Sequence, residues 1–147
     1  MNDLERIKAW LTTYSGYDRL QRVTVDYLSS DPNTGSITPS GLVELSRVEN
    51  MMGSVLVENQ YCFGLYFVMA KTTGDDTNAV ENAAWILGLQ QWVQEQSIRR
   101  LAPTFGDEPA TERMYAQNGV LYTDNNNGTA TYRVELTATF KKYYEVI

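Results

Sequence analysis

The sequence predicts an α+β fold in which a mainly antiparallel β-sheet is flanked by two α-helices and ends in a long C-terminal β-hairpin. Three observations predict it: apolar residues at helical spacing in two stretches, alternating polarity in several others, and a strong hairpin signal near the C-terminus. The length of 147 residues fits one domain and is enough to bury a core without disulfides. We therefore expect residues 1–147 to form a single domain.

The N-terminal segment predicts a helix followed by a strand. Within residues 3–14, Leu4, Ile7 and Leu11 recur at the spacing of an amphipathic helix. Residues 22–27 then alternate between polar and apolar side chains, which is typical of a half-buried strand.

The stretch from Ser29 to Gly41 is rich in Pro, Gly, Ser and Thr, and predicts a loop of about a dozen residues. A loop of this length calls for a reason. One interpretation is a mobile arm that becomes ordered against a partner, and the other is a solvated connector.

The middle of the chain predicts three strands. Residues 42–48 and 54–57 flank a break at Met51, Met52 and Gly53. Residues 60–71 form the most apolar segment, with large apolar side chains at both odd and even positions. We therefore expect this last strand to be covered on both faces.

A long helix is predicted at about residues 77–96, with acidic and capping residues at 73–78. It carries two apolar stripes, one with Val80 and Leu87 and the other with Leu89 and its neighbours. We expect the sheet to cover one stripe and another surface to cover the other.

The C-terminal third predicts an irregular segment, residues 101–111, followed by two long strands at 113–124 and 129–146. The strands are joined by residues 125–128, which end in Asn-Gly, a strong hairpin signal because both residues tolerate positive φ. In the last strand polar and apolar side chains alternate, so we expect one wet face and one dry face.

The composition excludes several kinds of function. The chain has no histidine, which is the commonest general base and metal ligand, and one cysteine, too few for a disulfide or a thiolate metal cage. We therefore expect no enzyme activity, no cofactor and no metal. The net charge of −6 argues against sequence-specific nucleic-acid binding, which normally requires a basic face.

The same composition bears on location. The longest apolar run, Tyr61 to Ala70, is far shorter than the ~20 residues that a membrane-spanning helix needs, so we expect no membrane segment. The lone Cys62 fits a reducing cytoplasm, or a particle assembled there, and its simplest role is that of a small buried apolar residue.

The densest mixed polar stretch contains Asp107, Glu108, Glu112 and Arg113. As a site, three carboxylates and a guanidinium could bind a cation or an anion. As structure, they form a turn fixed by Pro109, with Arg113 making a fork-shaped hydrogen bond to a carboxylate of its own or a neighbouring subunit. The structural interpretation is favoured.

Five tyrosines lie on the last two predicted strands: Tyr115, Tyr122, Tyr132, Tyr143 and Tyr144. Tyrosine has a large apolar body and a polar tip, which suits both subunit contacts and sheet faces. The sequence leaves both interpretations open.

Five segments carry a resemblance: residues 104–109, 112–119, 121–122, 128–132 and 134–145. In these segments the chain resembles minor capsid or tail-terminator-like proteins of tailed phages, over roughly residues 60–145. The first two segments read Thr104-Phe105-Gly106-Asp107-Glu108-Pro109 and Glu112-Arg113-Met114-Tyr115-Ala116-Gln117-Asn118-Gly119. The motif is a turn followed by a hairpin and carries no catalytic signature.

The resemblance implies a non-enzymatic protein that forms a ring, usually a hexamer. Such a ring caps the tail tube, stops its growth and joins it to the neck or collar, so the implied partners are the tail tube protein and neck, connector or sheath proteins. The implied location is a virion or phage-tail-like particle assembled in the bacterial host cytoplasm. An acidic ring would let DNA pass through its lumen without binding it.

The resemblance also implies that the segments 29–41 and 101–111 are contact arms. We therefore expect the following residues at inter-subunit or partner contacts: Asp31, Thr38, Asp107, Glu108, Glu112, Arg113 and Tyr115. Alternatives are another neck or minor capsid protein, such as a head-completion protein, and a small-ligand-binding α+β domain with its cavity between sheet and helix. A hydrolase or transferase is disfavoured by the missing histidine.

Overall fold

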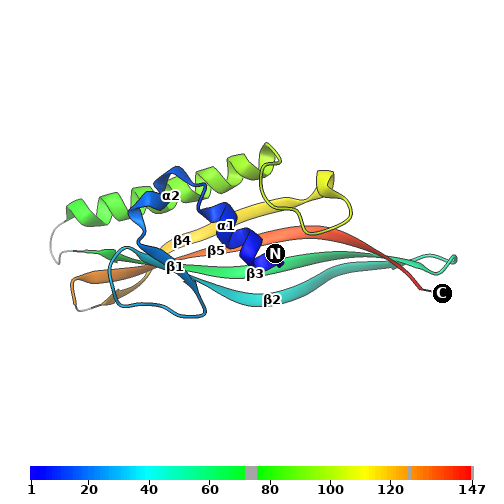
Figure 1. Cartoon of the computed structure of the whole chain (residues 1–147), viewed down its shortest axis with the longest axis horizontal. Helices are drawn as coiled ribbons and strands as arrows, with labels where there is room; N and C mark the ends of the chain where they lie inside the picture. Colours follow the sequence, from blue (N-terminus) through cyan, green and yellow to red (C-terminus); the bar gives the residue numbers. More distant parts are fainter. Residues whose placement is uncertain (72–75, 126, 147) are drawn as a thin grey trace.

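The computed structural model describes residues 1–71, 76–125 and 127–146, and these form two α-helices and one five-stranded sheet (Figure 1). The α-helices are α1 (Asp3–Leu11) and α2 (Asp76–Ile98), and the strands are β1 (Arg22–Val25), β2 (Thr34–Glu49), β3 (Ser54–Ala70), β4 (Arg113–Asn125) and β5 (Thr129–Glu145). The strand order is β1-β2-β3-β5-β4, with β1 parallel to β2 and every other pair antiparallel. The predicted α+β fold is confirmed.

Both helices pack on the same face of the sheet. Trp10 of α1 stacks on Trp92 of α2, with ring centroids 4.6 Å apart. Beneath them lie the alternate, fully buried side chains of β3 and β5, among them Leu65, Val134 and Leu136. We call the opposite side of the sheet the outer face.

Helix α1 begins at a side-chain cap and ends early. The Glu5 amide donates to Asn2 Oδ1 at 2.8 Å, which satisfies one of the free amides of the first turn. At the other end the Thr12 and Thr13 hydroxyls donate to backbone carbonyls one turn back. The helix therefore stops at Leu11 and not near residue 14, and the chain turns into a short 3₁₀ helix, Ser15–Arg19.

Much of the predicted loop 29–41 is strand, so that prediction is wrong from Thr34 onward. Thr34 pairs with Arg22 of β1 and with Val68 of β3, and Ile37 is fully buried. The proline and glycine residues predicted a loop, but in the structure they mark a β-bulge within β2, where the register shifts between Pro39 and Gly41.

The predictions for the central strands are partly wrong. The turn at Met51–Gly53 is confirmed, but residues 54–57 and 60–70 belong to one continuous strand, β3, and Lys71 lies just beyond its end. The outer face is only partly covered, because Cys62 and Tyr66 remain half-buried there although Val68 is buried.

Helix α2 matches its prediction in extent, although residues 73–75 of its predicted start lie outside the described residues. The stripe that includes Ile86, Leu89 and Val93 is buried against the sheet. The second stripe, with Val80 and Leu87, is exposed, so no surface within the described residues covers it.

The C-terminal hairpin is confirmed. Strands β4 and β5 pair antiparallel, and Gly128 adopts φ +82° in the connecting turn; Asn126 lies outside the described residues. The predicted dry face of β5 is observed, since Ala130, Val134 and Leu136 are buried. The predicted wet face is only half-buried from Arg133 to Thr139, and the prediction is wrong at the start of the strand, where Thr129 and Thr131 are buried.

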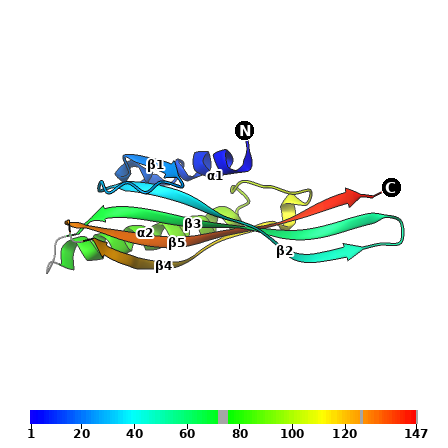
Figure 2. The ribbon, with the colours of Figure 1, turned by 90° about the horizontal axis from the view of Figure 1, so that it is seen from below.

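Beyond the helices the sheet continues as a three-stranded arm, formed by residues 42–60 of the β2–β3 hairpin and residues 139–146. Figure 2 shows this arm extending past both helices, with the β2–β3 turn at its far end. The helices therefore do not cover its faces: at its base Val57, Asn59 and Phe140 are still buried, whereas the side chains towards the β2–β3 turn are exposed.

We expect Leu65→Ala to lower the free energy of unfolding by about 2–5 kcal/mol, because it leaves a cavity in the core at a fully buried side chain. The matched control is Leu42→Ala on the arm, where 57% of the side chain is exposed and the expected loss is below about 0.5 kcal/mol. Urea unfolding followed by circular dichroism measures both. Equal losses would contradict the division into core and arm.

Candidate interaction surface

The predicted contact residues do not form one site. Asp31 and Thr38 lie at the β2 side of the sheet, while the others lie between the end of α2 and strand β4. Strands β3 and β5 separate the two groups. The structure therefore divides the predicted contact residues between opposite edges of the sheet.

The segment 26–33 crosses the outer face to connect two parallel strands. Arg22 donates to Ser29 Oγ at 3.0 Å and to Asp31 Oδ2 at 3.3 Å, and Thr34 donates to the Asp31 carbonyl at 2.8 Å. Asp31 thus closes the crossover between β1 and β2, although its exposed ion pair contributes little stability. Thr38 is half-buried on β2, opposite Gly64.

The irregular segment 101–112 is held in place by the Glu112 carboxylate. This group accepts hydrogen bonds from the amides of Phe105, at 2.8 Å, and Gly106, at 3.1 Å. Gly106 approaches β5 so closely that a Cβ there would lie 2.2 Å from the Lys141 carbonyl oxygen. Glu112 therefore acts within the chain.

Asp107 and Glu108 bind the segment to the start of the arm. The Asp107 amide donates to the Lys141 carbonyl at 2.8 Å, and Asp107 Oδ2 accepts from the Tyr143 amide at 2.8 Å. The Tyr143 hydroxyl donates to Glu108, and this hydrogen bond raises the pKa of Tyr143 above its ordinary value. The favoured interpretation of the polar stretch, a turn with Pro109 at the start of its 3₁₀ helix, is confirmed.

Arg113 and Tyr115 remain exposed at the start of β4. Arg113 Nη1 donates to the Glu112 carbonyl oxygen at 3.1 Å and has no carboxylate partner among the described residues. Of the two predicted partners, a carboxylate of its own subunit is not found among the described residues, and a carboxylate of a neighbouring subunit stays a prediction. Tyr115 lies on the outer face beside Thr137, with its ring half exposed.

Both long edges of the sheet are protected against direct strand pairing. At β4, Ser97 of α2 accepts from the Met114 amide at 2.9 Å, and Gln90 donates to the Ala116 carbonyl at 3.1 Å. The part of β2 that does not pair with β1 contains two bulges, and it also contains Pro39 and several charged residues. These features commonly prevent an edge strand from pairing with a strand of another molecule. Contacts with another molecule would therefore use side-chain surfaces.

The most exposed apolar surface is the arm tip, which we define as residues 48–55 and 143–146. On the outer face Val48, Leu56 and Tyr143 stand in one cross-strand row, and on the other face Val55 stands beside Tyr144. The exposed large apolar side chains of the tip are Val48, Met51, Met52, Tyr143, Tyr144 and Val146. A patch of this kind at the end of a projection is typical of a contact surface.

Sequence reasoning missed the arm tip. The consecutive Met51 and Met52 at a predicted turn were a usable signal, because turn residues are normally polar and both methionines are almost fully exposed. Of the five tyrosines, Tyr132 is buried in the core, while Tyr115, Tyr122, Tyr143 and Tyr144 are exposed, and their part in subunit contacts stays a prediction.

A second surface lies along α2. A groove of about 450 Å³ runs between the C-terminal half of α2 and the first residues of β4. It is lined by Gln90, Gln91, Gln94, Ser97, Ile98 and residues 113–117. The basic side chains of Arg99, Arg100 and Arg113 stand at this end of the helix, and Ile98 and Leu101 are exposed beside them.

A second groove, of about 400 Å³, lies between the N-terminal residues and the β2 bulge, and Tyr61 and Cys62 are among its lining residues. The Tyr61 hydroxyl donates to Asp3 Oδ2 at 2.6 Å. Burial first, and this hydrogen bond second, raise the pKa of Tyr61 to about 12. Cys62 is half-buried, so its predicted burial is incomplete.

Two further observations concern the described residues only. Among residues 1–71, 76–125 and 127–146, no three His, Cys, Asp or Glu side chains are grouped so that they could hold a metal ion. Neither described helix combines the length and the hydropathy that crossing a membrane requires.

We expect Glu112→Ala to destabilise the protein by about 1–3 kcal/mol, because two backbone amides lose their acceptor. The neighbouring Arg113→Ala should change stability by less than about 0.5 kcal/mol, since its side chain is exposed. Thermal and urea unfolding measure both variants. A larger loss of stability for Arg113→Ala than for Glu112→Ala would show that Arg113, and not Glu112, stabilises the segment.

We expect stability to fall as pH rises from the unfolded tyrosine pKa of about 10 towards the folded Tyr61 pKa of about 12. The sign follows because the folded state holds the Tyr61 proton more tightly than the unfolded state does. Tyr61→Phe should flatten this part of the stability profile, as measured by urea unfolding at successive pH values. An unchanged slope in the variant would contradict the Tyr61–Asp3 contact.

Comparison with known proteins gives no assignment. No protein-family model matches the chain, and no curated protein matches it. The function has to be inferred from the surfaces themselves: an apolar arm tip, a groove beside basic residues, and carboxylates that act within the fold.

Proposed function

We propose that the protein is a non-enzymatic assembly protein of a phage or phage-like tail, a tail terminator that forms a ring on the end of the tail tube. In this role it stops growth of the tube and joins it to the neck or collar. The partners are further copies of the chain, the tail tube protein, and neck, connector or sheath proteins. The location is the virion or tail-like particle, assembled in the bacterial cytoplasm.

The observation that carries the proposal is the arm. It projects past both helices and exposes apolar side chains on both faces of its tip. Exposed apolar side chains do not stabilise an isolated chain, because the favourable free energy of removing them from water is gained only when they are buried. An assembly protein gains a contact that forms only when a neighbour is present.

The arrangement of the polar stretch supports the same role. Glu112 and Asp107 tie segment 101–112 to its own chain, and Arg113 and Tyr115 are exposed beside it. A segment held in one conformation loses little entropy when it meets a partner. The net charge of −6 favours a ring through which DNA passes without binding.

Electron microscopy of particles tests the proposal by location and tail length. The label is a tag at the N-terminus, where Met1 is exposed. We expect the label at the end of the tail tube, and tails of uncontrolled length from a host that lacks the gene. A host that carries the untagged gene and yields normal tails is the control.

The outcome of this experiment also separates the alternatives. A label at the portal, with tails of normal length after gene deletion, would support a head-completion or other neck protein instead. Particles without the protein would contradict both assembly roles.

A further inference from the structure

We propose that the arm tip of one copy docks into the groove at the C-terminal end of α2 of a second copy, in a head-to-tail contact. The inference deepens the proposed function, and it rests on that function for the closure of successive contacts into a ring. The contact itself follows from the shapes and charges of two surfaces of this chain.

The tip is apolar and acidic. Its residues, 48–55 and 143–146, include Glu49 and Glu145 and no basic side chain. Arg47 and Lys142 stand one row further back on the arm, and Arg47 is paired with Glu44 at 2.6 Å. The tip therefore carries a net charge of −2 at neutral pH.

The groove is the matching surface: its lining combines neutral polar side chains, mostly glutamines, with the apolar Ile98 and Met114 and the basic Arg113, and Arg100 follows the end of α2 close by. Ile98 and Leu101 are exposed beside it. Arg100 and Arg113 donate to the backbone carbonyls of Ala110 and Glu112, and neither has a carboxylate partner among the described residues. Their positive charges are thus available to a carboxylate that arrives from outside.

The nearby charges do not cancel this positive field. Glu95 is paired with Arg99 at 3.0 Å, so the two largely offset one another. The Glu112 carboxylate accepts from the neutral amides of Phe105 and Gly106 and keeps its negative charge, so Arg99, Arg100 and Arg113 against Glu95 and Glu112 leave a net charge of +1 here. The charge complementarity therefore pairs Glu49 and Glu145 of the tip with Arg100 and Arg113 of the groove.

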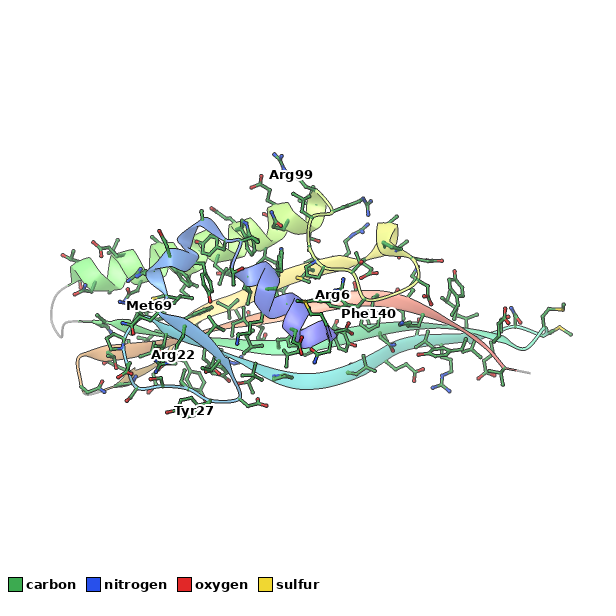
Figure 3. All side chains as sticks on the ribbon, in the orientation of Figure 1. Arg6, Arg22, Tyr27, Met69, Arg99 and Phe140 are labelled. Carbon is green, nitrogen blue, oxygen red and sulfur yellow. The ribbon has the colours of Figure 1, made fainter. Side chains whose placement is uncertain are left out.

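Geometry makes the contact intermolecular. The tip lies at one end of the long axis of the molecule, and the C-terminal end of α2, marked by Arg99 in Figure 3, lies far from it. A single chain cannot bring the two surfaces together without unfolding. The acidic charge of the tip also disfavours nucleic acid as the partner that binds the tip.

A contact between two different surfaces of identical chains is heterologous. Each copy then offers a free tip and a free groove, so contacts propagate until they close into a ring or form a filament. The flexible side chains of Met51 and Met52 suit a groove of irregular shape. The protected sheet edges explain why side chains, and not backbone hydrogen bonds, make this contact.

Disulfide trapping tests the contact directly. In a Cys62→Ser background, Met52→Cys places a thiol on the tip and Ile98→Cys places one beside the groove. We expect oxidation of the concentrated double variant to give a ladder of covalent oligomers on a non-reducing gel. Each single-cysteine variant should give no product larger than a dimer.

The matched control combines Met52→Cys with Leu28→Cys, an exposed apolar position on the segment 26–33, away from the groove. A ladder as strong as that of the Ile98→Cys pair would show unspecific collision and overturn the proposal. The absence of a ladder from the Ile98→Cys pair would overturn it as well.

A charge exchange supplies an independent test. We expect Glu49→Arg and Arg100→Glu each to weaken self-association about tenfold, which corresponds to roughly 1.4 kcal/mol, and the double variant to restore it. Glu81→Arg, on the N-terminal half of α2, is the control and should leave association unchanged. Sedimentation velocity measures all four. If the double variant associates no more tightly than either single variant, the result would contradict the pairing of Glu49 with Arg100.

The two proposals fail in distinguishable ways. A covalent ladder from a protein that is absent from tail ends would retain the contact and remove the terminator role. If the protein is located at the tail end but gives no ladder, the terminator role is retained and the tip–groove contact is removed. Another surface of the chain, or a tube protein, would then occupy the groove.

Discussion

Strands β3 and β5 pair along their whole lengths, from Ser54 opposite Glu145 to Ala70 opposite Thr129, and this ladder fixes the shape of the molecule. A strand of 17 residues is about 56 Å long. Helix α2, the longer of the two described helices, has 23 residues and is about 35 Å long. The paired strands are therefore longer than the helix packed on them, and the arm follows from this difference.

The division into a covered and an uncovered end organises the rest of the structure. At the covered end Trp10, Trp92 and the buried side chains of β3 and β5 form one core. At the uncovered end the same strands carry apolar side chains into solvent. Segment 101–112 lies at the boundary, where Asp107 and Glu108 hold it against β5. The groove and the arm tip thus belong to one framework but lie at different places along it.

The sequence analysis located elements that depend on local patterns. The periodicity of α2 and the Asn-Gly turn of the last hairpin were sufficient to predict these two elements, because both signals arise within a few residues. The loop 29–41 was mispredicted because Pro39 and Gly41 mark a bulge within β2, and pairing with β1 and β3 outweighs their local preference. The partners of Glu112 and Asp107 are backbone amides, and no spacing of side chains reveals them. The arm tip was missed because alternation in a strand does not indicate whether another layer covers it.

The central claim is that the chain carries two complementary surfaces, the arm tip and the groove, that bind one another between copies. Hydrogen–deuterium exchange, compared between dilute and assembled protein, measures both surfaces at once. The account predicts slower exchange on assembly in residues 48–55 and 143–146 together with residues 97–101 and 113–117. Unchanged exchange in these four segments, with protection of the segment 26–33 instead, would contradict it.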